Sequence, residues 1–138
     1  MSFIPKLKLG ISGYNAGDYS IDGIVSTNLN EIEIKGGLSI QQIEPTFMQQ
    51  EFKSNAIQWN NDFSKVSVNQ VYGSLSTQQT NHNLKFDVMA ENTNGLIYYH
   101  SDNQISQFND NLNWLRVIVS HHFKNEYIGS DFSLTYQN

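Results

Sequence analysis

Apolar residues recur at every second position in segment after segment of this chain, and this period of two constrains its fold more than any other feature. Leu7 and Leu9 alternate with polar residues near the N-terminus, and Phe132, Leu134 and Tyr136 do the same near the C-terminus. Successive side chains of a β-strand point to opposite faces, so this alternation is typical of strands with one apolar face. The chain is therefore predicted to be all-β.

The spacing of these segments predicts eight to ten strands, the usual number for a sandwich or a barrel. We expect an antiparallel β-sandwich, jelly-roll-like, with at most one or two short helices. A closed β-barrel is the alternative. The 138 residues contain no repeat, linker or charge block, so residues 1–138 are predicted to form a single all-β domain that is large enough for a core.

A first hairpin is predicted around the pair of glycines at 36 and 37. A three-residue loop over residues 35–37 pairs Ile34 with Leu38 and keeps the flanking apolar residues on one face, with Gly37 in the left-handed region. The alternative is one long strand that bends at Gly36.

A second hairpin is predicted at residues 92–95, which read Asn-Thr-Asn-Gly. A four-residue loop there would place His100 directly opposite Asp87. The stretch from Phe86 to Tyr99 resembles a hairpin of laminin-G-like jelly rolls, and no functional residue is transferred from that resemblance.

Three segments carry weaker signals. Residues 45–53 fit either a short helix with Pro45 in its first turn or an irregular strand. Residues 106–114 are predicted to hold a helical turn, because Phe108 and Leu112 are four residues apart. Residues 114–121 are apolar on both faces, which predicts a central strand covered on both sides.

The composition excludes several partners. Only 15% of the residues are charged, and Asn and Gln make up roughly a fifth of the chain. With a net charge of −5, a single arginine (Arg116) and scattered lysines, the chain lacks the basic patch that nucleic-acid binding requires. No apolar run reaches the length of a transmembrane helix, so no membrane insertion is expected.

The location of the protein is left open by the sequence. The N-terminus has no signal-peptide pattern, and the chain contains no cysteine. We therefore expect a protein that is cytoplasmic, virion-associated or exported by a non-classical route.

The chain carries no motif of nucleophilic, phosphate-binding or metal chemistry, so no catalytic residue, cofactor or metal site is predicted. Asp87 and His100 are weak metal candidates, because a carboxylate can orient an imidazole. A sugar site, by contrast, needs a flat apolar ring beside amide and carboxylate groups. Trp59, Asn60, Asn61 and Asp62 supply that combination in a predicted turn, and Tyr98 and His100 could supply it on a strand.

Three functions are considered. The leading hypothesis is a non-enzymatic structural or assembly subunit of a viral, phage-like or secretion apparatus, which binds protein partners or itself through sheet surfaces and edge strands. Amide-rich surfaces support this hypothesis because they are desolvated more cheaply than charged ones. The alternative is a lectin-like carbohydrate-binding module. A small hydrolase or metal enzyme that uses Asp87 and His100 is the least favoured.

Overall fold

A computed structural model describes residues 1–77, 79 and 81–138, which form nine strands and one short helix. In chain order these are β1 (Ser2–Leu9), β2 (Tyr19–Leu29), β3 (Ile32–Ile43), α1 (Phe47–Gln50), β4 (Glu51–Lys53), β5 (Gln58–Asn60), β6 (Val66–Thr77), β7 (His82–Tyr99), β8 (Ile105–Lys124) and β9 (Gly129–Gln137).

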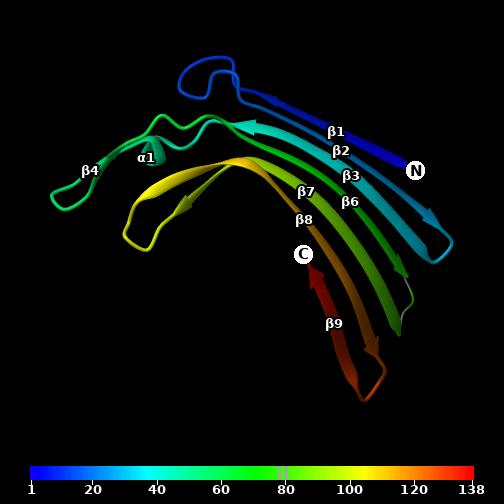
Figure 1. Ribbon diagram of the computed structural model, residues 1–138. Coiled ribbons are helices and arrows are strands. Elements are labelled where there is room, and N and C mark those ends of the chain that lie inside the picture. Colours follow the sequence, from blue (N-terminus) through cyan, green and yellow to red (C-terminus); the bar gives the residue numbers. More distant parts are fainter. Residues whose placement is uncertain (78, 80) are drawn as a thin grey trace.

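The strands form two antiparallel sheets. Seven of them pair in the order β1-β2-β3-β6-β7-β8-β9, and β4 pairs with β5 in a separate hairpin (Figure 1). The predicted all-β, antiparallel, sandwich-like fold class is confirmed. The closed-barrel alternative is not supported, because β1 and β9 end the large sheet and do not pair with each other.

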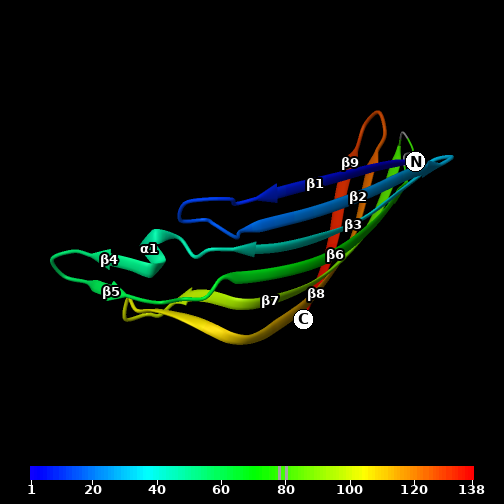
Figure 2. The same cartoon turned by 90° about the horizontal axis from the view of Figure 1, so that it is seen from above.

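The large sheet is strongly curved, and β9 runs at a steep angle to β1 in Figure 2. The two ends of the sheet differ. The long connections 10–18 and 44–65 and the turn at 100–104 lie at one end, which we call the loop end, and α1, β4 and β5 project from it (Figures 1 and 2). The β2–β3, β6–β7 and β8–β9 connections lie at the other end.

The hairpin predicted at residues 35–37 is wrong, and the alternative of one long strand is correct. β3 runs without interruption through both glycines, and the chain reverses earlier, at Asn30, which has a φ of 55°. A Cβ atom on Gly37 would lie 2.5 Å from the ring of Tyr72 on β6. Glycine is therefore needed at position 37 to make room for an aromatic ring, and it does not form a turn.

The hairpin predicted at residues 92–95 is also wrong. β7 continues through this segment, and its pairing with β8 shifts between Asn94 and Leu96, on either side of Gly95 with its φ of 75°. Glycine in the left-handed region is typical of such a β-bulge. The resemblance to a laminin-G-like hairpin ends with this correction, because Phe86 and Tyr99 lie on one strand.

The weaker segment predictions have mixed outcomes. Residues 47–50 form the short helix α1, and residues 51–53 form strand β4, so both readings of 45–53 are partly correct. The helical turn predicted in 106–114 is wrong, because these residues belong to β8.

The sheet has almost no apolar interior. Among the described residues Ile105 is the only buried large hydrophobic one, at 7% exposure, although the chain length allows a core. The double cover predicted for residues 114–121 is not present, since Leu115 remains 40% exposed. The apolar residues of the strands therefore lie on a surface.

Candidate functional site

The unbroken register of the large sheet sorts its side chains into two faces, because alternate residues of paired strands share a face. We call one of these faces the apolar face. It consists of alternate residues on each of the seven strands, which the strand register aligns with one another. Its large members include Phe3, Leu7, Leu9, Ile21, Val25, Ile34, Leu38, Ile40, Val71, Leu75, Leu84, Phe86, Val88, Leu115, Val117, Val119, Phe132, Leu134 and Tyr136.

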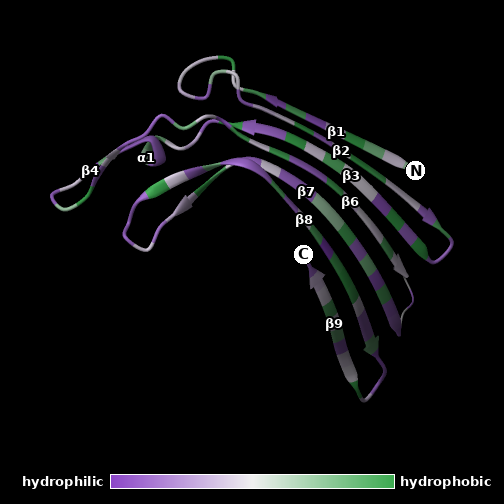
Figure 3. Cartoon of the chain, viewed as in Figure 1, coloured by the Kyte–Doolittle hydropathy of each residue, from purple (hydrophilic) through white to green (hydrophobic). Residues whose placement is uncertain are grey.

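The apolar face carries no Asp, Glu, Lys or Arg on β1, β2, β3, β6 or β9, on β7 up to Asn94, or on β8 from Asn111 onward. Its side chains are nevertheless exposed: Phe3, Val71 and Leu134 are 64%, 63% and 62% exposed. The alternation of apolar and polar residues is visible along each strand in Figure 3. Exposed apolar surfaces of this extent are uncommon on monomeric soluble proteins.

The opposite face, which we call the polar face, holds every charged residue of these strand segments. A row of six matched positions crosses it from β1 to β8. The row consists of Lys6, Asp22, Ser39, Gln70, Glu91 and Trp114.

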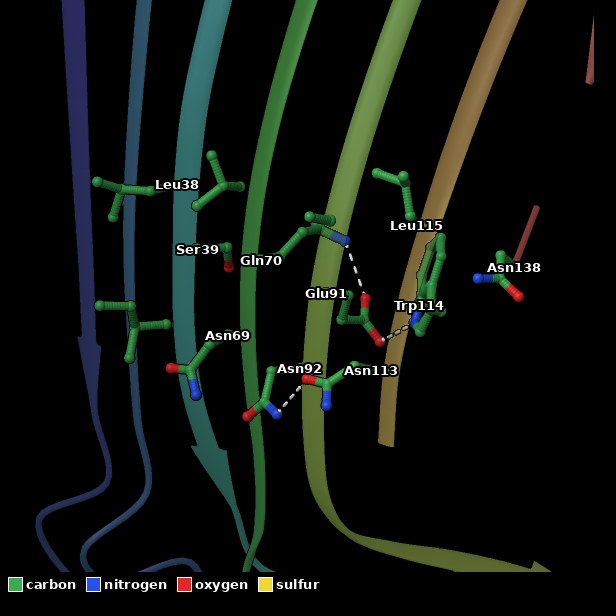
Figure 4. A pocket seen from close by; sticks show the side chains of 13 residues that line it. Leu38, Ser39, Asn69, Gln70, Glu91, Asn92, Asn113, Trp114, Leu115 and Asn138 are labelled. Carbon is green, nitrogen blue, oxygen red and sulfur yellow. Dashed lines mark hydrogen bonds between the residues drawn. The ribbon is translucent and has the colours of Figure 1, made fainter. Parts of the chain in front are cut away.

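Glu91 is the centre of a hydrogen-bond network in this row (Figure 4). Its carboxylate accepts hydrogen bonds from Gln70 Nε2 at 3.1 Å and from Trp114 Nε1 at 2.8 Å. Thr93 Oγ1 donates a third at 2.9 Å, and the Arg116 guanidinium lies 5.6 Å from the centre of the Trp114 ring. Three neutral donors thus hold a carboxylate in one orientation on the polar face.

Asp22 is held in the same way on β2. Ser39 Oγ donates to Asp22 Oδ1 at 2.7 Å, and Ser20 Oγ donates to Oδ2 at 2.9 Å. Lys6 is its register partner on β1. Elsewhere on this face, Lys85 and Asp87 form an ion pair at 3.0 Å. Several charged side chains of the polar face are therefore held in place by their neighbours.

Rows of amides end the apolar face on the side of the loop end. Asn69, Asn92 and Asn113 are register partners on β6, β7 and β8, and Asn92 Nδ2 donates to Asn113 Oδ1 at 2.8 Å. In the next row Asn94 Nδ2 donates to Asn111 Oδ1 at 3.3 Å. The first row borders a shallow depression of about 610 Å³ whose other walls include Leu38 and Leu115 (Figure 4).

At the loop end, Asp18 ties the connection 10–18 to both ends of the connection 44–65. Its Oδ1 accepts hydrogen bonds from Lys65 Nζ at 2.7 Å and from the backbone N–H of Glu44 at 2.8 Å, and Asn15 Nδ2 donates to Oδ2. Burial opposes ionisation of Asp18, but these hydrogen bonds and the charge of Lys65 outweigh it and lower the pKa of the carboxyl. The hydrogen bond to Asp18 raises the pKa of Lys65.

A second hollow at the loop end, of about 360 Å³, lies between the β4–β5 hairpin and the turn that joins β7 to β8. Trp59 and Asn61 line it from the first side, and Asp102, Asn103 and Gln104 line it from the second. The predicted turn at 59–62 is only partly correct, because Trp59 and Asn60 end strand β5.

The other predicted site residues lie elsewhere. Tyr98 and His100 have ring centres 4.8 Å apart, and His100 Nε2 lies 2.9 Å from Ser106 Oγ, but neither residue lines this hollow. Asp87 does not lie opposite His100, because the hairpin that would pair them does not form; its register partners are Ser74 and Ile118. The described residues contain no cluster of three or more potential metal ligands.

Sequence reasoning missed the complete separation of charge between the two faces. The signal was present, because Lys6 and Lys8 have the opposite parity to Leu7 and Leu9, and the same holds in each strand. Within the part of the chain that the structure describes, no helix has the length and apolar character needed to cross a membrane.

Comparison with known proteins gives one match. A family model described as "Putative porin" matches residues 1–138, the whole of the chain. No curated protein and no solved structure matches it.

Proposed function

The chain belongs to this porin family, and from that premise we propose that its large sheet forms part of the wall of a membrane pore, with the apolar face on lipid and the polar face on water. Family membership and the all-β fold agree with a non-enzymatic protein. Under this proposal, the structural role predicted from the sequence is that of a pore wall.

The observation that carries the proposal is the absence of charge from one face only. A sheet with water on both faces gains nothing from removing every charge from one of them. In lipid, by contrast, a Lys or Arg at the midplane of a pore wall costs about 2–4 kcal/mol, while residues that face the lumen are free to be polar. The adjacent residues Phe86 and Asp87, which lie on the apolar and the polar face, follow the same rule.

Strand length supports the proposal. A strand that crosses a bilayer at a tilt needs about 9–11 residues. The strands β2, β3 and β6 have 11, 12 and 12 residues. Their backbone groups are paired within the sheet, which lipid requires.

The edge strands β1 and β9 each have one neighbour in the sheet. Because an unpaired edge is unfavourable in lipid, we propose that both edges pair with further strands, supplied by additional sequence or by another copy of the chain. The sequence predicted association through edge strands, and under this proposal that association completes the pore wall.

The proposal departs from the expectation that the chain does not insert into a membrane. That expectation rested on the lack of a long apolar run. A strand that alternates between lipid and water has no such run, because only every second residue faces the lipid.

The experiment uses the absence of cysteine from the chain. Val117 and Ile118 are neighbours on β8 and are similar in size and hydrophobicity, yet they lie on opposite faces. In lipid vesicles, we expect Ile118→Cys to react with a membrane-impermeant maleimide and Val117→Cys to be protected. A fluorophore on Val117→Cys should be quenched by brominated lipid.

Equal labelling of both positions would contradict the proposal. Conductance of the parent chain in a planar bilayer measures the pore itself. We expect discrete steps that a membrane without protein does not show.

A further inference from the structure

We propose that the hollow at the loop end, between the β4–β5 hairpin and the β7–β8 turn, binds a neutral sugar. The hollow lies at the loop end, where Ile105 at the start of β8 is the one lining residue that belongs to the large sheet, so this inference does not depend on which face of the sheet meets lipid. Its volume of about 360 Å³ lies within the range of about 300–1,000 Å³ that is usual for small-molecule sites.

Four of the nine lining residues carry a side-chain amide, and Ala56, Ile57 and Ile105 add apolar surface. Gln58 and Asn61 contribute from the hairpin side, and Asn103 and Gln104 contribute from the turn, beside the single carboxylate of Asp102. A lining of this kind gains little from burying an apolar ligand. It can exchange many hydrogen bonds with a ligand that carries both donors and acceptors, as each hydroxyl of a sugar does.

Trp59 supplies the flat apolar surface. Its ring stacks on Phe52 with centroids 4.7 Å apart, and its indole N–H donates to the carbonyl of Met48 at 2.9 Å. These contacts fix the ring and satisfy its only polar group. Phe52 covers one face of the ring, and Trp59 also forms part of the hollow wall.

The polar groups around the ring retain hydrogen-bonding capacity. Asn61 Nδ2 donates to the Gln49 carbonyl at 3.1 Å, which fixes the amide and leaves its oxygen as an acceptor. Asp102 Oδ1 accepts from the Gln104 backbone N–H at 3.2 Å. Within the described ranges, the side-chain amides of Gln58, Asn103 and Gln104 form no hydrogen bond with other protein groups.

The charges favour a neutral ligand. No lysine, arginine or histidine lines the hollow, so it has no cation to bind a phosphate or a sulfate. Asp102 is its only carboxylate, which is too few for a hard metal ion that takes six or more oxygen ligands. A sugar ring on Trp59, with hydroxyls toward Asp102 and the amides, uses the flat ring and the polar side chains of the lining.

The test uses the intrinsic fluorescence of the full chain in a sugar-free detergent such as an alkylamine oxide. The chain has two tryptophans, so Trp114→Phe leaves Trp59 as the only one. Trp114 lies on the polar face of the sheet and does not line the hollow. We expect D-glucose, D-galactose or a trisaccharide of either to shift the Trp59 emission in a saturable manner, with glycerol as the control solute.

Variants across the hollow from Trp59 test the assignment without altering the reporter. In the Trp114→Phe background, Asp102→Asn and Gln104→Ala should each weaken sugar binding about tenfold, as expected for the loss of one or two hydrogen bonds. Asp110→Asn removes the same charge outside the hollow and should bind as the parent does.

Three outcomes would overturn the proposal: no saturable shift with any of the sugars, an equal shift with glycerol, or unchanged binding in both Asp102→Asn and Gln104→Ala. Because the titration measures no conductance, its failure would leave the pore proposal standing, and loss of the pore proposal would leave this one standing.

Discussion

The two faces of the large sheet share one backbone and one hydrogen-bond ladder, yet their side chains obey opposite rules. On the polar face, carboxylates such as Asp22 and Glu91 are each held by two or three side-chain donors. On the apolar face, Phe3, Val71 and Leu134 are more than half exposed. The apolar alternation therefore leaves its side chains at a surface, since the described residues contain almost no core for them to cover.

The largest predicted effect comes from placing a charge on each face in turn. Val88 and Met89 are neighbours on β7 and lie on the apolar and polar faces. Under the proposed pore function, Val88→Lys places an ammonium in hydrocarbon, and we expect it to lower the free energy of unfolding in lipid vesicles by about 2–4 kcal/mol. Met89→Lys should cost less than about 1 kcal/mol, because it remains in water.

Urea unfolding of both variants in the same vesicles, followed by tryptophan fluorescence, measures the difference. Equal losses would mean that the two faces meet the same solvent, and the comparison between them would then have no functional meaning.

A smaller effect is expected at Gly95, where the register between β7 and β8 shifts and the simple division into faces ends. Its φ is 75°, and an added Cβ would lie 2.9 Å from Gln107 Nε2. We expect Gly95→Ala to cost about 2–3 kcal/mol, from the left-handed backbone and the contact together.

Gly13 is the matched control for this substitution. Its φ is 78°, but no atom lies within 4 Å of the added Cβ. Gly13→Ala should therefore cost only the backbone part, about 1–2 kcal/mol. If the two variants lose equal stability in urea unfolding, the contact with Gln107 contributes nothing.

Strands were the most predictable part of the fold, because the alternation of apolar and polar residues can be read directly from the sequence. The turns were not. The pair Gly36-Gly37 and the sequence Asn94-Gly95 both predict reversals, yet both lie inside long strands. A glycine can indicate either a left-handed backbone or the close approach of another group, and only the strand register shows which of the two applies at a given site.

The candidate site was predictable in composition and not in geometry. The sequence identified Trp59 and Asn61 as part of a sugar-binding combination, and both line one hollow in the structure. The sequence did not indicate which residues lie across the hollow from them, because Asp102 and Gln104 reach the hollow through a turn more than 40 residues away. For Asp87 and His100 the sequence predicted a contact that the structure does not contain, because that contact depended on a hairpin that does not form.

Adjacent glycines on β3 sharpen the comparison of the faces further. An added Cβ on Gly37 would lie 2.5 Å from the Tyr72 ring on the polar face, whereas one on Gly36 would meet nothing closer than 3.7 Å on the apolar face. We expect Gly37→Ala to cost about 1–2 kcal/mol and Gly36→Ala to be close to neutral. The measurement is again urea unfolding in vesicles.

Removal of the ring tests this explanation of the cost. In the Tyr72→Ala background, Gly37→Ala should become close to neutral, since the atoms that it displaces are gone. A cost that persists in that background would place its origin in the backbone of β3 and exclude the Tyr72 ring.

The smallest effect is expected at the loop end, which neither face includes. The pKa of Asp18 is lowered in the folded protein, so its contribution to stability is complete above the unfolded value of about 3.9 and is lost as the pH falls through the folded value. Asp18→Asn should therefore cost less than about 1 kcal/mol at pH 7, and the difference from the parent should shrink below about pH 3.9. Asp62→Asn removes an equal charge from an exposed carboxylate that forms no ion pair with the described residues, and it is the matched control. If the two variants show the same pH dependence, the Asp18 carboxylate does not anchor the loop end, and other contacts there, such as the hydrogen bond from Tyr14 to the Pro45 carbonyl, hold the connections.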